Sequence, residues 1–107
     1  MICALTARRI ADGKTQEFIE AFASGADNMP DDVRDRFKAV YACEDVADPQ
    51  VILTFGLFDG TIKELRELQT AGARTEQIDS ITPLVEDVLI DTSFEVIREF
   101  VSEGAFG

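Results

Sequence analysis

Two neighbouring stretches of the chain show the hydrophobic patterns of β-strands. Side chains alternate from Phe37 to Glu44, which predicts a strand whose one face carries Phe37, Ala39, Tyr41 and Cys43. Val51–Phe58 is almost continuously apolar, as expected of a central strand that is covered on both faces. The turn-rich segment between the two predicts an antiparallel hairpin.

Two further strands are expected towards the ends of the chain. Ile2–Ile10 is apolar and favours a strand, and Asp12-Gly13 then supplies a turn. The last strand is expected from about Val88 to Ile97, with residues 99–107 as a tail.

Between the first strand and the hairpin, apolar residues recur at helical spacing. Lys14–Ser24 is a predicted helix, and Gly25 stands where a helix C-terminal glycine is expected. Pro30 and the two aspartates after it predict the first turn of a short helix.

A second helical region follows the hairpin. Thr61 and Glu64 have the spacing of a capping box, and the predicted helix after them has the apolar stripe Ile62, Leu65 and Leu68. Pro83 is expected to end or kink a further helical segment, which carries Ile78, Ile81, Leu84 and Val85.

The order of elements is therefore β-α-β-β-α-β, which predicts an α+β, ferredoxin-like antiparallel sheet with helices on one face. Right-handed crossovers give an expected spatial strand order of 4-1-3-2. No linker or repeat divides the 107 residues, so we expect a single domain over residues 1–107 with its core in about residues 1–98.

Composition excludes several kinds of chemistry. The chain has 21 acidic and 10 basic residues, a formal charge of -11, and neither His nor Trp. Nucleic acid and membrane surfaces are not expected as partners, because phosphates bind clustered Lys and Arg. Without His there is no His-ligated zinc or haem and no Ser-His-Asp triad, and we expect no metal and no cofactor. We attribute the excess of acidic residues to a general role in keeping the protein soluble, and the alternative is adaptation to a salt-rich host.

Cys3 and Cys43 are predicted to be free thiols. They show neither metal-site spacing nor a disulfide framework, and the expected strand order places them on strands that are not neighbours. The first residues are charged too early for a signal peptide, and no apolar run approaches the roughly 20 residues of a membrane span. These features predict a soluble, cytoplasmic protein.

Most of the chain resembles one known family. ALTARRIADGKTQEFIEAF, at residues 4–22, is similar to the first strand, Gly-Lys turn and helix of the dimeric α+β barrel superfamily. YACEDVADPQVILTFGLFDG resembles the second and third strands of its antibiotic biosynthesis monooxygenase family. TIKELREL and PLVEDVLIDTSFEVI resemble the following helix and the last crossover and strand. The resemblance covers about residues 1–98.

The resemblance implies a homodimer in which two four-stranded sheets pack face to face into a barrel. The pattern gives a physical reason for it, because a sheet with helices on one face leaves its other face to be buried. Since Val51–Phe58 is apolar on both faces, a monomer would expose an apolar patch. The alternative is that the C-terminal tail covers this face.

The resemblance also implies two kinds of chemistry, namely cofactor-independent oxygenation of polyphenolic or quinol substrates and degradation of haem. Haem degradation is excluded, because those members use a His ligand. The family often has a His-containing stretch before the last strand, and here residues 70–74 read Thr-Ala-Gly-Ala-Arg.

Tyr41, Asn28 and Arg74 are the candidate catalytic residues. Tyr41, the only tyrosine, could orient a substrate hydroxyl or share its proton, or be an ordinary sheet residue. Asn28 follows the first helix, where the family's pocket mouth lies, and could bond a ketone or enolate oxygen or cap a helix. Arg74 could pair with an anionic substrate or a phenolate, or form a surface ion pair.

Phe55, Phe58 and Phe22 are the candidate substrate-binding residues, with a core role as their alternative. Arg8 and Arg9 lie on opposite faces of the first strand. One of them is expected to point to solvent and the other towards the helices or the dimer barrel.

Three further polar residues are assigned structural roles. Asp91 and Glu95 are too far apart along a strand to share a proton, so we expect a solvated edge or partners for the arginines. Cys43 is expected to be a small hydrophobic residue, since no His is present to activate it.

Two functions therefore remain open. The first is a cofactor-independent monooxygenase that acts on a small aromatic, quinol or polyketide-like molecule in a pocket within each subunit. The alternative is a non-catalytic homodimer of the same fold that binds a small molecule or has a structural or regulatory role.

Overall fold

The computed structural model describes residues 1–69 and 79–100 of the chain. Its four strands form one antiparallel sheet in the order β2-β3-β1-β4, which confirms the predicted topology. The strands are β1 (Ile2–Ile10), β2 (Phe37–Glu44), β3 (Val51–Phe58) and β4 (Val85–Glu95). The first three have the predicted bounds. Cys3 and Cys43 are free and lie on β1 and β2, with β3 between them.

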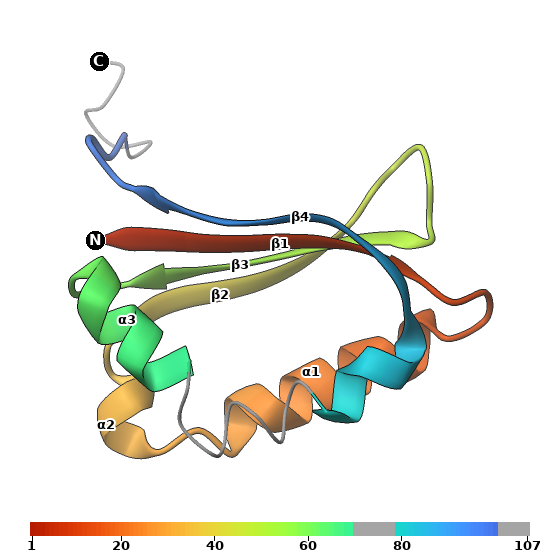
Figure 1. Cartoon of the computed structure of the whole chain (residues 1–107), viewed down its shortest axis with the longest axis horizontal. Coiled ribbons are helices and arrows are strands. Elements are labelled where there is room, and N and C mark those ends of the chain that lie inside the picture. Colours follow the sequence, from red (N-terminus) through yellow and green to blue (C-terminus); the bar gives the residue numbers. More distant parts are fainter. Residues whose placement is uncertain (70–78, 101–107) are drawn as a thin grey trace.

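All of the helices within the described ranges cover one face of the sheet (Figure 1). They are α1 (Thr15–Asp27), α2 (Asp31–Arg34), α3 (Ile62–Gln69) and the 3-10 turn η1 (Thr82–Leu84). The fold is therefore α+β and ferredoxin-like, as predicted, and we call the uncovered side of the sheet the open face. None of the helices in the described ranges has the length and apolarity needed to cross a bilayer.

The expected end of α1 and both expected ends of β4 are wrong. Gly25 does not end α1, because the helix continues to Asp27 and the Asn28 N–H still donates to the Ser24 carbonyl at 3.0 Å. β4 begins at Val85 instead of Val88, because Val85 already pairs with Ile10 of β1, and it ends at Glu95. Pro83 lies in η1, so the prediction that helical structure ends there is confirmed.

The predicted face of β2 is wrong at its first residue. The pairing of β2 with β3 shifts between Phe37, which opposes Phe58, and Ala39, which opposes Leu57. A bulge of this kind turns the side chains before it to the other face. The Phe37 ring therefore packs against the Phe58 ring beneath the helices, with 5.1 Å between the ring centres. The Tyr41 ring stacks on the Phe55 ring on the open face, with 4.9 Å between the ring centres.

The core between sheet and helices is divided into two clusters. The first joins the end of β1 to α1 and contains Ile10, Phe18, Ile52 and Ile81. The second joins the start of β1 to α3 and contains Ile2, Phe58 and Leu65. Each cluster includes residues from β1, β3 and a helix, so the helices are attached at both ends of the sheet.

A salt bridge lies over the second cluster at the protein surface. Arg36 Nη1 lies 2.8 Å from Glu64 Oε2, its Nε donates to the Asp59 carbonyl, and its guanidinium lies 4.8 Å from the centre of the Phe58 ring. A Cβ at Gly60 would lie 2.5 Å from Phe58 Cε2, so glycine leaves room for this arrangement. Thr61 and Glu64 also form the predicted capping box, with bonds of 3.1 and 3.2 Å.

Glu64→Gln should reduce the stability of the fold modestly at pH 7. The difference in stability between this variant and wild type should become smaller in acid. Bonds from Arg36 and then Thr61 lower the pKa of Glu64 from 4.5 to about 2. The carboxylate therefore stabilises the fold above about pH 4.5, and this contribution is lost as the pH falls towards 2. Urea midpoints measured from pH 7 to pH 2 test this.

Glu44→Gln, at the exposed end of β2, is the matched control and should follow wild type at every pH. A difference between Glu64→Gln and wild type that stays constant over the whole pH range would contradict the role given to the salt bridge.

Candidate functional site

Side chains facing the helices are large at both ends of the two central strands and small in the middle. On β1 they are, in order, Ile2, Ala4, Thr6, Arg8 and Ile10. The partners on β3 are, in the same order, Phe58, Gly56, Thr54 and Ile52. The large apolar ends belong to the two core clusters. Between them the small side chains do not reach the helices, so space remains.

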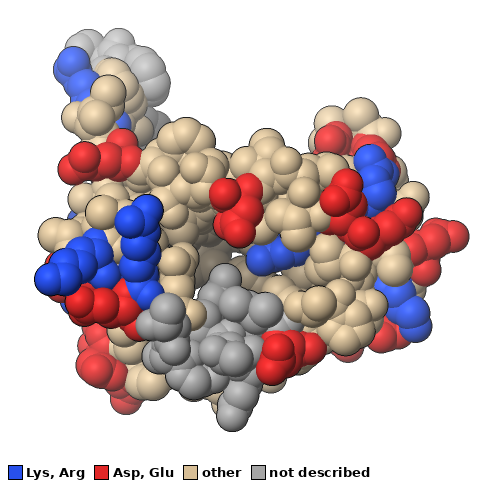
Figure 2. All heavy atoms as spheres, viewed as in Figure 1, with Lys and Arg blue, Asp and Glu red and all other residues tan. Residues whose placement is uncertain are grey.

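This space is a cavity of about 200 Å³ between sheet and helices. Its floor, on the sheet, includes Ala4, Thr6, Thr54, Gly56, Asp91 and Ser93. Its roof, on and between the helices, includes Phe22, Ala26, Met29, Val33, Leu65 and Leu68. A cavity of roughly 150 Å³ is enough to hold one benzene ring. Figure 2 shows the surface hollowed near the centre of this view, between the sheet and the helices.

The five predicted site residues that the structure describes do not all gather at the cavity. Phe22 lines it, and Phe55 also borders it, although the Phe55 ring stacks on Tyr41 on the open face. Phe58 is 0% exposed within the second core cluster and does not line it.

The three candidate catalytic residues are placed elsewhere or lie beyond the described ranges. Tyr41 is 51% exposed on the open face, across the sheet from the cavity. Asn28 is exposed and donates through Nδ2 to Ser24 Oγ at 3.3 Å, while Met29 beside it lines the cavity. Arg74 lies outside the described residues.

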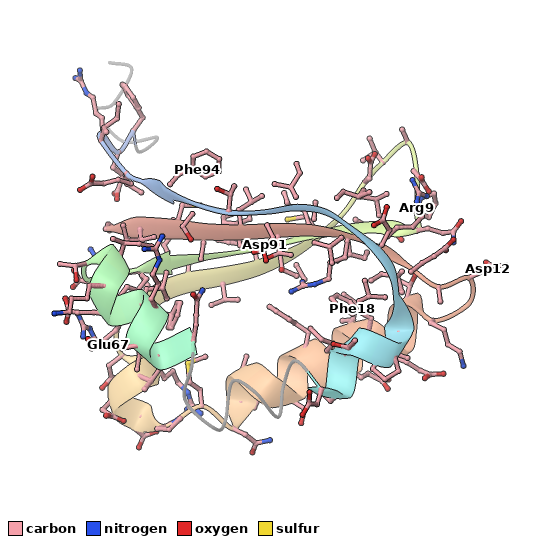
Figure 3. The ribbon with its side chains drawn as sticks, viewed as in Figure 1. Arg9, Asp12, Phe18, Glu67, Asp91 and Phe94 are labelled. Carbon is pink, nitrogen blue, oxygen red and sulfur yellow. The ribbon has the colours of Figure 1, made fainter. Side chains whose placement is uncertain are left out.

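The two arginines of β1 point to opposite faces, as predicted. Arg8 is buried beneath the helices, where Nη1 donates to Thr54 Oγ1 at 3.0 Å and the guanidinium lies 5.7 Å from the Phe18 ring centre. Arg9 forms a 2.8 Å salt bridge with Asp48 near the hairpin turn (Figure 3). The hydrogen bond from Arg9 lowers the pKa of Asp48.

Asp91 is a cavity residue for which the sequence led us to expect only a solvated edge or an ion pair with the arginines. It is exposed, as predicted, but it also lies on the floor, where Oδ1 accepts a hydrogen bond from Thr6 Oγ1 at 3.4 Å. Among the described lining residues it is the one with an ionisable side chain. Its pairing with Thr6 places it opposite a small residue of the floor.

A second cavity, of about 490 Å³, adjoins the first but is less enclosed. It is lined mainly by β4 and η1, and it shares Thr6 and Asp91 with the first cavity. Its lining is more highly charged, with Arg8, Glu86, Asp87 and Asp91. We therefore take the first cavity, with its apolar roof, as the candidate site for a small molecule. In the described ranges, no group of three or more His, Cys, Asp or Glu side chains is placed to hold a metal ion.

Comparison with known proteins gives a likeness in structure alone. No family model matches the chain, and no curated protein matches its sequence. A structure from Chloroflexus aurantiacus, assigned to the antibiotic biosynthesis monooxygenases, has a TM-score of 0.75 at 15% identity and covers 94% of this chain and 96% of its own. One from Deinococcus radiodurans with the same assignment has a TM-score of 0.75 at 17% identity, covering 97% and 100%.

Protein SO0527 from Shewanella oneidensis shares 20% identity at a TM-score of 0.68, with 87% of each chain covered. The chain thus has the fold of antibiotic biosynthesis monooxygenase structures, which is the fold that the sequence resemblance predicted.

Thr54→Val should destabilise the protein by about 1.5–3 kcal/mol, because it removes the buried hydroxyl that accepts from Arg8 and that lies 3.5 Å from the Thr6 carbonyl. Urea unfolding would measure the loss. Thr54→Ser keeps the hydroxyl and should retain most of the stability. Equal stability of Thr54→Val and wild type would show that this buried hydroxyl contributes nothing to the fold.

Proposed function

We propose that the protein binds a compact, mostly apolar molecule in the cavity and oxidises it with O2 without a cofactor. The observation that carries the proposal is the cavity itself, with an apolar roof and a floor that bears hydroxyls and one carboxylate. The fold shared with antibiotic biosynthesis monooxygenase structures supports the reaction class. The cavity volume of about 200 Å³ is large enough for a molecule with one aromatic ring.

The chemistry needs O2, an enclosed site and a substrate that binds in its neutral form and becomes an electron-rich anion once it is deprotonated there. A quinol would react as hydroquinone + O2 → 2-hydroxy-1,4-benzoquinone + water, with one oxygen atom entering the ring. The substrate supplies the four electrons that reduce O2. The protein would orient the ring beneath residues such as Phe22 and Leu65 and exclude water from it.

A second candidate is a non-catalytic small-molecule-binding protein of the same fold. The positions of Tyr41 and Asn28 favour it, because neither side chain lines the cavity. Both candidates require a ligand in the cavity, and they differ in whether O2 is consumed.

Ala26→Phe should abolish binding of a single-ring ligand, because Ala26 lies on the roof and a larger side chain would fill the cavity. Ala23→Phe is the matched control, since Ala23 is an exposed residue of the same helix. Titration of benzyl alcohol followed by amide NMR shifts would measure binding. Wild type and Ala23→Phe should show shifts at floor and roof residues, and Ala26→Phe should not.

Oxygen uptake with hydroquinone, corrected for uptake in buffer, separates the two candidates. Uptake by wild type and Ala23→Phe, but not by Ala26→Phe, would support oxygenation in the cavity. Binding without uptake would favour the non-catalytic candidate. Absence of binding would overturn both.

We further propose that the open face is covered by a second copy of the chain. Large apolar side chains remain exposed there, with Tyr41 at 51%, Ile90 at 50% and Phe94 at 54%. Figure 3 shows Phe94 on the opposite side of the sheet from Phe18. The described part of the tail does not cover this face, because Ile97 is 96% exposed and the chain turns away from the sheet after β4 (Figure 1).

Ile90→Asp should convert a dimer into a monomer, because it places a charge on this apolar face. Light scattering with size-exclusion chromatography should give about twice the 11.8 kDa chain mass for wild type and the chain mass for the variant. Val46→Asp, at a fully exposed turn position, should remain dimeric. A monomeric wild type would refute the proposal.

A further inference from the structure

The carboxylate of Asp91 is the one charge on the described lining of the candidate cavity. Asp91 lies on β4 directly opposite Thr6 of β1, on the side of the sheet that faces α1 (Figure 3). The remaining described lining residues are apolar or neutral and polar. Among the described lining residues, a ligand in the cavity would therefore meet one carboxyl group, at the floor.

Within the described residues, most of the acceptor positions of the Asp91 carboxylate have no donor from the protein. A carboxylate has roughly four acceptor positions and no donor when it is ionised. Thr6 Oγ1 provides one long hydrogen bond, of 3.4 Å. No salt bridge joins Asp91 to any residue within residues 1–69 and 79–100.

The buried arginine of β1 is engaged in other contacts. Arg8 is one helix-facing position beyond Thr6, but Nη1 donates to Thr54 and the guanidinium lies over Phe18. Arg8 lines the second cavity and not the first. The other charges around that second cavity are Glu86 and Asp87, which have the same sign as Asp91.

From this arrangement we infer that Asp91 determines which ligands the cavity accepts: neutral or cationic molecules that carry a hydrogen-bond donor. A ligand hydroxyl or amine can donate to the free acceptor positions of the carboxylate. A ligand carboxylate would be repelled and would offer no donor, so anionic ligands are rejected. This inference rests on the proposed function, because it needs a ligand in the same cavity.

Three single-ring probes that differ at one carbon test the selectivity. Toluene has no donor, benzyl alcohol has one, and benzoate is an anion. Amide NMR shifts of floor and roof residues should give a dissociation constant for each probe. Wild type should bind benzyl alcohol most tightly and benzoate most weakly, with about a tenfold step between benzyl alcohol and toluene.

Asp91→Asn should change this order, because the amide has nearly the same shape, can still accept from Thr6 and carries no charge. Affinity for benzoate should rise about tenfold or more, and affinity for toluene should not change. Glu95→Gln is the matched control, because Glu95 is an exposed carboxylate on the same strand and the same face but lines neither cavity. It removes one negative charge, as Asp91→Asn does, and should leave the wild-type order intact.

Several outcomes would overturn the inference without touching the proposed function. They are equal affinities of wild type for all three probes, tighter binding of benzoate than of toluene, or the same gain for benzoate in Glu95→Gln as in Asp91→Asn. The wild-type order decides the matter even if Asp91→Asn does not fold. If no probe shifts any cavity residue, both the inference and the proposed function fail.

Discussion

The size of the side chains that the sheet directs towards the helices determines the rest of the structure. Large apolar residues at both ends of β1 and β3 pack against α1 and α3 and hold the helices in place. Small residues between them leave the helices unsupported over the middle of the sheet. Protein interiors are normally close-packed. Because the floor of the cavity does not contact the helices, the two core clusters on either side of it must hold the helices in position.

Much of the fold could be predicted because turns and hydrophobic patterns agree. Asp12-Gly13 marks the end of β1, and Gly13 has φ 76°, which glycine adopts without strain. Two features had no local signal. Gly25 lies inside α1, where a glycine costs about 1 kcal/mol relative to alanine, a loss that the packing of Phe18 can offset. The bulge after Phe37 is set by pairing with β3, and alternation within β2 does not reveal it.

The candidate site was harder to predict than the fold, because a strand pattern does not say which face the helices cover. In the apolar run of β3, Phe55 and Phe58 look alike, yet Phe55 stacks on the open face and Phe58 is fully buried beneath α3. The same ambiguity affects Tyr41. A signal was nevertheless present in the sequence, since Thr54 and Gly56 interrupt the large residues of the strand at alternate positions. Small residues two apart in a central strand indicate space above one face.

The cavity and the open face are two sides of the same strands, so what happens on one side constrains the other. Phe55 packs against Tyr41 on the open face, and the residues on either side of it, Thr54 and Gly56, form part of the floor. Successive residues of a strand share one backbone, and a second sheet that immobilises Phe55 therefore also fixes the floor. Among the described residues, no large side chain fills the cavity to maintain its shape. In the proposed dimer, the partner's sheet on the open face would help to hold the floor, which gives the dimer a direct role in maintaining the proposed binding site.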